Sequence, residues 1–145
     1  MAFEFPLDPL LRVQQSLERQ EELALQEILV RIAEVQRRID ALAKDVARSR
    51  QQLEEKLRQT LPAGEVDAIT RQIEGALVSR QELANSLQEL LRQREAQTRK
   101  YQEAHQRRRT LSDMRDSQRE TWLHERARVE QKFVDDVFGA RAQRK

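Results

Sequence analysis

The residue types that most often carry catalysis are scarce in this chain. Cysteine is absent, and the two histidines, His105 and His124, stand apart from each other. The three glycines are scattered singly, so no glycine-rich loop could cradle a phosphate. Asp135 and Asp136 are adjacent, and neighbouring helical residues point in different directions, so they make a poor metal-binding pair. We therefore expect no enzyme, no cofactor and no metal site.

A basic cluster is the other candidate for chemistry. Between residues 99 and 115, six basic residues stand against two acidic ones. Such a cluster could bind nucleic acid or an anionic membrane surface. Acidic residues continue on either side of it, which favours a solvated helix surface. We expect no nucleic-acid partner and no direct membrane insertion, and a basic surface binder stays open as a hypothesis.

The composition points to long helices. The 145 residues are 36% charged and 38% hydrophobic, with three Gly, three Pro and 4% aromatic residues. Ordinary soluble domains are about 25% charged and about 45–50% apolar. A chain with so little apolar volume cannot fill a thick core, and its net charge of only +2 argues against disorder. A coiled coil, in which only a narrow seam is buried, is the structure that fits.

One break interrupts the helical pattern, at Leu61-Pro62-Ala63-Gly64. Proline disfavours helix at the residue before it, and glycine tolerates the dihedral angles of a tight reversal. We expect a single domain over residues 1–145, with one helix over about 9–60, a turn over 61–64 and a second helix over about 65–139.

Apolar residues follow alternating steps of three and four on both sides of the break, which is the pattern of a coiled-coil seam. The first seam comprises Ile28, Ile32, Val35, Ile39, Leu42, Val46 and Leu53, and Leu10, Val13, Leu17 and Ala24 extend it upstream through a stutter. The second comprises Ile69, Ile73, Ala76, Leu83, Leu87 and Leu90, then thins, with Arg80, Arg94, Arg108 and Arg115 at other seam positions.

Two helices joined by a short turn pack antiparallel. Folding at residues 62–64 pairs positions whose numbers sum to about 125–126, so Phe3 should lie opposite Trp122, and Phe5 close to it. The fold class expected is all-α: a long antiparallel two-helix coiled-coil hairpin. The second helix is longer, and residues 123–145 should form an overhang with exposed Phe133 and Phe138.

Both ends of the chain carry motifs beyond periodicity. The first reads F-x-F-x-L-x-x-L-L-R over residues 3–12, and the second reads R-x-x-Q-K-x-x-D-D over residues 128–136. With the length and the single central turn, they resemble the FliJ family of bacterial flagellar type III export proteins. The usual second motif ends in Asp-Glu, and Asp136 takes the Glu position here.

The resemblance implies a partner set. Family members are stalk-like antiparallel coiled coils that bind the hexameric flagellar export ATPase, contact the membrane export gate protein and escort export chaperones. It also implies a cytoplasmic protein, held at the inner face of the membrane through the export apparatus. The ATPase contact expected is Arg128, Gln131, Lys132, Asp135 and Asp136; the export-gate contact expected is Ile69, Ile73, Ala76 and Arg80. The stalk protein of a virulence secretion system and a generic scaffolding coiled coil stay open as alternatives.

Overall fold

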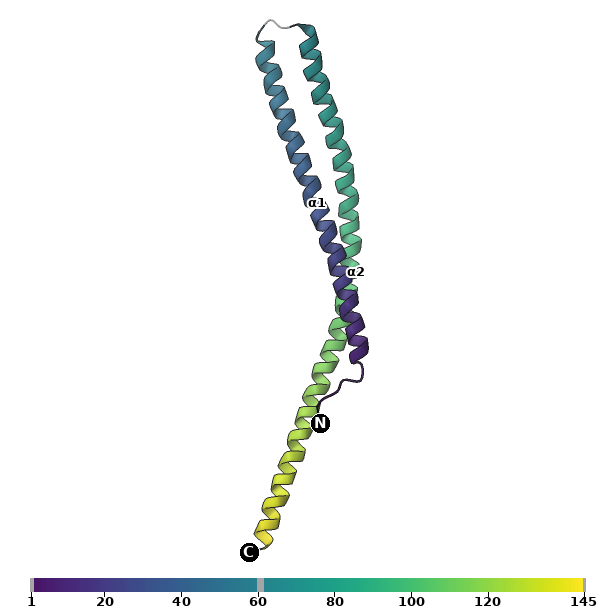
Figure 1. Ribbon diagram of the computed structural model, residues 1–145, viewed down its shortest axis with the longest axis vertical. Helices are drawn as coiled ribbons and strands as arrows, with labels where there is room; N and C mark the ends of the chain where they lie inside the picture. The colour runs from purple at the N-terminus through teal and green to yellow at the C-terminus, as the bar shows by residue number, and fades with distance from the viewer. Residues whose placement is uncertain (1, 60–61, 145) are drawn as a thin grey trace. The chain divides into compact units, whose positions relative to one another are not determined.

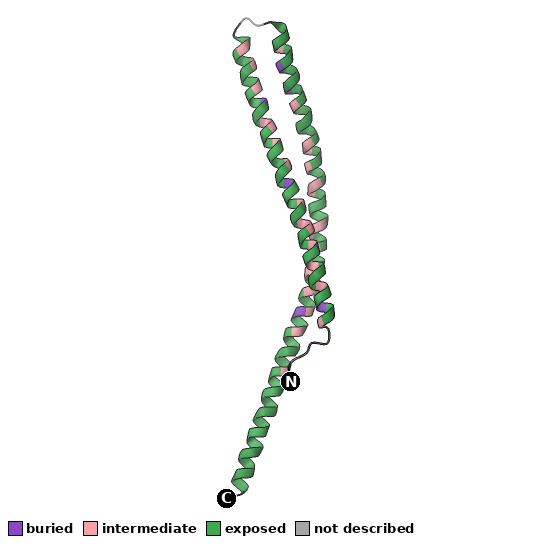
Figure 2. Ribbon diagram, in the orientation of Figure 1, coloured by how far each residue is buried: buried purple, intermediate pink, exposed green. Residues whose placement is uncertain are grey.

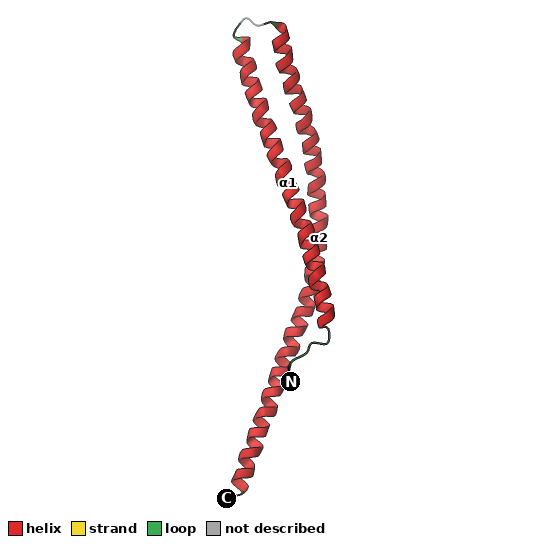
Figure 3. Ribbon diagram, viewed as in Figure 1, coloured by secondary structure: helices red, strands yellow, loops and turns green. Residues whose placement is uncertain are grey.

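The computed structural model describes residues 2–59 and 62–144. It consists of two helices, α1 (Asp8–Leu57) and α2 (Ala63–Gln143) (Figure 1). The described chain is 93% helical, the two helices pack against each other, and Figure 3 shows no strand in the described ranges. The expected all-α fold, an antiparallel helical hairpin, is confirmed. Residues 139–143 are also helical, so α2 runs four residues beyond the end expected at Gly139.

Helix α1 begins at two residue types that favour the start of a helix. Asp8 is its first residue and Pro9 its second, where a missing N–H costs no intrahelical bond. The Asp8 N–H donates to the Phe5 carbonyl at 3.0 Å, which closes a turn ahead of the helix. The Asp8 carboxylate also accepts from Arg12 Nε at 3.1 Å, one helical turn on. These contacts join the N-terminal segment to the first turn of α1.

The connection between the helices differs from the expected turn. Helix α1 ends at Leu57, and Thr60 and Leu61 lie outside the described residues. Ala63 and Gly64, expected in the turn, instead belong to the first turn of α2. Gly64 has no positive φ, because it lies within the first turn of α2. The Glu65 N–H donates to the Pro62 carbonyl at 3.1 Å, so Pro62 accepts the first hydrogen bond of the helix.

The chain divides into two units, which are described separately. The first comprises residues 22–100, the part of the hairpin next to the turn. Its core cluster consists of Val46, Ile69 and Ile73, each no more than 9% exposed, with Leu53 and Ala76 packed against it. Leu53 and Ile73, whose numbers sum to 126 as the antiparallel pairing requires, share this cluster. Near the turn, Lys56 Nζ lies 4.0 Å from the Glu65 carboxylate.

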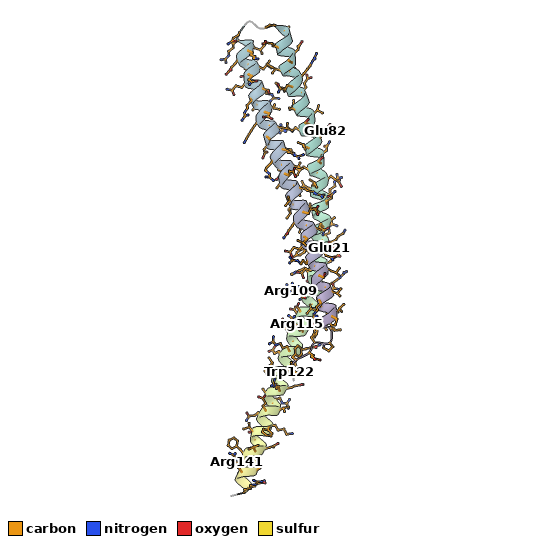
Figure 4. The ribbon with its side chains drawn as sticks, in the orientation of Figure 1. Glu21, Glu82, Arg109, Arg115, Trp122 and Arg141 are labelled. Atoms are coloured by element: carbon orange, nitrogen blue, oxygen red, sulfur yellow. The ribbon has the colours of Figure 1, made fainter. Side chains whose placement is uncertain are left out.

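The second unit comprises residues 2–21 with residues 101–144, and its core is small. The buried side chains are Phe5, Leu11, Ala104 and Ser112, and Leu11 is only 1% exposed. Phe3 and Trp122 pack with ring centroids 6.0 Å apart and a 50° angle between the rings. The expected opposition of these two residues is confirmed, and Figure 4 shows Trp122 on α2 beside the N-terminal segment.

The expected seam at the start of α1 is wrong for Leu10, Val13 and Leu17, whereas Ala24 is partly buried. Leu10, Val13 and Leu17 are 44%, 54% and 39% exposed, whereas Leu11 is fully buried. Between residues 11 and 32, the buried or partly buried positions 11, 14, 18, 21, 25, 28 and 32 follow alternating steps of three and four, and position 24 is also partly buried. The seam therefore runs without a stutter, and Gln14, Glu18 and Glu21 occupy its positions. Glu18 can take such a place because α2 supplies His105 and Arg108 as its partners.

Candidate functional site

The C-terminal overhang of α2 is the most exposed part of the second unit. Every described residue from 123 to 144 is exposed, as the unbroken green in Figure 2 shows. The segment is helical through Gln143, because no proline interrupts it and Gly139 alone costs about 1 kcal/mol relative to Ala. A helix of this length keeps its side chains in a defined angular order. The overhang can therefore present distinct faces to a partner.

Four of the five expected ATPase-contact residues share one face of this helix. At 100° per residue, Arg128, Gln131, Lys132 and Asp135 fall within about a 100° arc. Gln131 Nε2 donates to Asp135 Oδ1 at 3.1 Å. Asp136 lies outside that arc, at the border of the opposite face. Among the described residues, Arg128, Lys132 and Asp136 make no ion pair, so their charges are available to a partner.

The opposite face of the overhang is apolar. Its members are large side chains that a soluble helix would normally bury: Leu123 50% exposed, Val129 68%, Phe133 69%, Val134 42%, Val137 36% and Phe138 64%. Arg126 and Glu130, which pair at 3.4 Å, lie within this face and separate Leu123 from the rest. Beyond them, Phe133, Val134, Val137 and Phe138 form a continuous patch. Exposed apolar patches are typical of protein–protein or membrane interaction sites.

The four expected gate-contact residues divide between core and surface. Ile69 and Ile73 are each 9% exposed and belong to the core cluster around Val46, and Ala76 packs against that cluster. Arg80 is exposed and makes no ion pair within the described parts of the chain. The two isoleucines therefore stabilise the hairpin, and Arg80 is the member whose charge a partner can reach.

A polar layer crosses the seam of the second unit. Arg108 Nε donates to Glu18 Oε2 at 2.5 Å, and His105 Nδ1 lies 3.2 Å from Glu18 Oε1. The Glu18 side chain is 16% exposed and that of Arg108 is 26% exposed. The hydrogen bond from Arg108 is the main cause that lowers the pKa of Glu18 below its ordinary value, while partial burial acts in the opposite direction. The same bond raises the pKa of Arg108.

This layer serves folding. Glu18 is held ionised by two neighbours, and Arg108 also donates to the buried Ser112 hydroxyl at 3.4 Å. Such a pair in a coiled-coil seam specifies which residues face each other. Within the described residues, no group of three or more His, Asp or Glu side chains could hold a metal ion. Within the described parts of the chain, neither helix contains a stretch with the length and hydrophobicity of a membrane span.

Comparison with known proteins gives the family. A sequence model of the flagellar FliJ protein matches residues 3–145, which is nearly the whole chain. The chain belongs to the FliJ family. Curated proteins and solved structures gave no significant match.

Membership in the FliJ family makes this a flagellar export-related protein that associates with the flagellar export apparatus as a non-catalytic component. The resemblance inferred from the end motifs is thereby confirmed. The matched range includes both the N-terminal segment that packs on Trp122 and the overhang.

Sequence reasoning missed the partnership of Glu18 with His105 and Arg108. The sequence did contain a signal for this partnership, because Arg108 occupies a seam position. Residues whose numbers sum to about 126 lie opposite each other in the hairpin, so Arg108 lies opposite residue 18. A search for apolar residues alone passes over such a pair.

Proposed function

We propose that this protein is the central-stalk-like coiled coil of the flagellar export ATPase. It binds the hexameric ring, promotes ATP hydrolysis, and couples the ring to the export gate and the export chaperones. The observation that carries the proposal is the overhang of this FliJ-family chain, whose end motif R-x-x-Q-K-x-x-D-D lies on an exposed stretch of helix. Its location would be the cytoplasmic face of the inner membrane, reached through the export apparatus.

The two faces of the overhang suit a ring partner differently. The charged face offers Arg128 and Lys132 for weak, exchangeable contacts, because exposed ion pairs contribute only about 0–1 kcal/mol each. The apolar patch around Phe133 and Phe138 supplies hydrophobic contact area, worth roughly 25 cal/mol per Å² buried. A stalk must contact successive ring subunits without locking to one of them. We infer that the apolar patch provides most of the binding affinity. The weak contacts of the charged face would let the stalk pass from one ring subunit to the next.

The hairpin itself fits the same role. A pair of packed helices is about 20 Å across, narrow enough for the channel of a hexameric ring. We further propose that the gate contact lies on the turn-proximal part of α2, with Arg80 as its accessible charge. Ile69 and Ile73 would support that contact indirectly, by holding α2 against Val46.

Stimulation of the purified export ATPase tests the ATPase contact. We expect deletion of residues 123–145 to abolish stimulation, while circular dichroism still reports a helical protein. Normal stimulation by the truncated chain would place the ATPase contact elsewhere.

Point variants sharpen the test. The double variant Arg128→Glu with Lys132→Glu reverses the charged face and should weaken stimulation. The matched control is Arg37→Glu with Lys44→Glu, which reverses one arginine and one lysine on exposed positions of α1. Equal loss in both double variants would show a general charge effect and would contradict a specific contact at the overhang.

A further inference from the structure

The N-terminal strap, residues 2–21, packs on residues 101–122 of α2 within the second unit. Its buried apolar side chains are those of Phe5, 7% exposed, and Leu11, 1% exposed. The next three seam positions of the strap are polar: Gln14, Glu18 and Glu21. From residue 28 to residue 53, by contrast, the seam of α1 is apolar at every position but Ser49. Since hydrophobic stabilisation follows the apolar area buried, the strap is held less strongly than the rest of α1.

The middle of the strap is held by the polar layer around Glu18. The Glu18 carboxylate contacts Arg108 Nε and His105 Nδ1 of α2. One helical turn earlier, Gln14 Oε1 is buried and has no hydrogen-bond partner among the described residues. A buried acceptor without a donor favours any conformation in which water reaches it. This part of the strap therefore depends on the contacts of one carboxylate.

The end of the strap is held by an aromatic contact at Trp122. Phe3 packs on the indole with ring centroids 6.0 Å apart, a separation typical of attractive aromatic pairs. The guanidinium carbon of Arg126 lies 5.3 Å from the centroid of the same indole, within the range of a cation–π interaction. Trp122, labelled in Figure 4, is thus held by contacts from both the strap and the overhang.

One apolar stripe of α2 runs under the strap and continues into the overhang. At 100° per residue its members fall within about a 40° arc; they are Ala104, Leu111, Trp122, Val129 and Phe133. Ala104 is buried and Leu111 and Trp122 are partly buried, whereas Val129 and Phe133 are 68% and 69% exposed. The strap therefore occupies the upstream part of this stripe and leaves the downstream part open, with Trp122 at the boundary.

We propose that the N-terminal strap is an autoinhibitory cover that opens as one unit. On opening, Phe3 leaves Trp122, Glu18 leaves Arg108, and α1 unwinds as far as residue 21 while residues 22–100 stay folded. The unwinding is cooperative because a helix as short as residues 8–21 is marginal in water without a partner.

The open chain presents the whole stripe of α2, from Ala104 to Phe133, instead of its downstream part alone. The closed strap withholds the upstream part from a partner that covers the overhang. Use of the longer stripe by the export ATPase rests on the proposed function, whereas the opening of the strap does not.

Hydrogen exchange of the full-length chain at neutral pH, read by mass spectrometry, tests the opening. Amides of residues 9–20 should exchange about tenfold or more faster than those of residues 28–53, because they need only the local opening. Phe3→Ala should speed exchange throughout residues 9–20 by about two- to tenfold, the equivalent of one lost aromatic pair, and leave residues 28–53 unchanged. The matched control Phe133→Ala removes an exposed phenylalanine of the overhang and should alter neither range.

Glu18→Ala tests whether the two attachments hold one unit. It should speed exchange over the same residues 9–20, including those nearer to Phe3 than to Glu18. Equal exchange of residues 9–20 and 28–53 in the unmodified chain would overturn the proposal. So would a response to Phe3→Ala confined to the first turn of α1, which is ordinary fraying, or an equal response to Phe133→Ala. The experiment contains no ATPase, so its failure counts against the strap alone, and the proposed function is judged by the stimulation assay.

Discussion

The ion pair between Glu18 and Arg108 should contribute measurably to the stability of the second unit. A hydrogen bond to a charged group is worth about 1.5–3 kcal/mol, and an exposed ion pair about 0–1 kcal/mol. The Glu18 and Arg108 side chains are 16% and 26% exposed, so this pair is closer to a buried hydrogen bond to a charged group than to an exposed ion pair. We therefore expect Glu18→Ala to lower the free energy of unfolding by about 2 kcal/mol.

Trp122 makes this prediction easy to measure. It is the only tryptophan of the chain, and it packs on Phe3 within the same unit as Glu18. Urea denaturation followed by Trp122 fluorescence therefore reports on this unit, and circular dichroism reports on helix throughout the chain. The matched control is Glu27→Ala, which removes an exposed pair with Arg31 and should cost only about 0.2–0.5 kcal/mol.

A double-mutant cycle isolates the pair. In the chain with Arg108→Ala already present, Glu18→Ala should cost much less than in the unmodified chain, with a coupling energy of about 1.5–2 kcal/mol. A coupling below about 0.5 kcal/mol would refute the reasoning, because Glu18 and Arg108 would then behave as a solvated surface pair.

The same pair predicts a pH dependence. The pKa of Glu18 is lowered in the folded state from its ordinary value of 4.5, chiefly by the hydrogen bond from Arg108. Its stabilisation is therefore fully present above pH 4.5 and is lost as the pH falls through the lowered folded-state pKa. We expect Glu18→Gln to flatten the acid limb of the Trp122-monitored stability curve. An acid limb identical in both proteins would contradict the assignment.

Three further predictions concern packing and helix propensity. Ile73→Ala should destabilise the chain by about 2–4 kcal/mol in thermal denaturation, because it opens a cavity in the core cluster, whereas Val30→Ala on the surface should stay within about 0.5 kcal/mol. Phe3→Ala should expose Trp122 to water and shift its emission to the red; unchanged emission would mean that the 6.0 Å ring contact is absent in solution. Gly75→Ala should stabilise α2 by about 0.5–1 kcal/mol, since a Cβ there meets no atom within 4 Å and the backbone is helical; a lower melting temperature would contradict this.

Much of the fold was predictable because its signals are local. The seam from Ile28 to Leu53 and the break before Pro62 predicted two helices and an antiparallel hairpin, and the sum rule placed Phe3 opposite Trp122. The turn was less predictable, because Gly64 can adopt helical dihedral angles as readily as those of a reversal. The candidate ATPase contact was predictable as exposed helix, and its division into a charged and an apolar face follows from 3.6-residue geometry alone.

What the sequence alone determined is therefore the pair of helices, their direction and the surplus apolar residues at both ends of the chain. Only the tertiary structure decided which stripe of α1 is buried in the second unit. Leu10, Val13 and Leu17 form the more hydrophobic stripe, yet the stripe with Gln14 and Glu18 faces α2. The physical reason is that a carboxylate can be buried only beside partners that hold its charge. For Glu18 those partners, His105 and Arg108, lie 87 and 90 residues away along the chain and become its neighbours only when the hairpin closes.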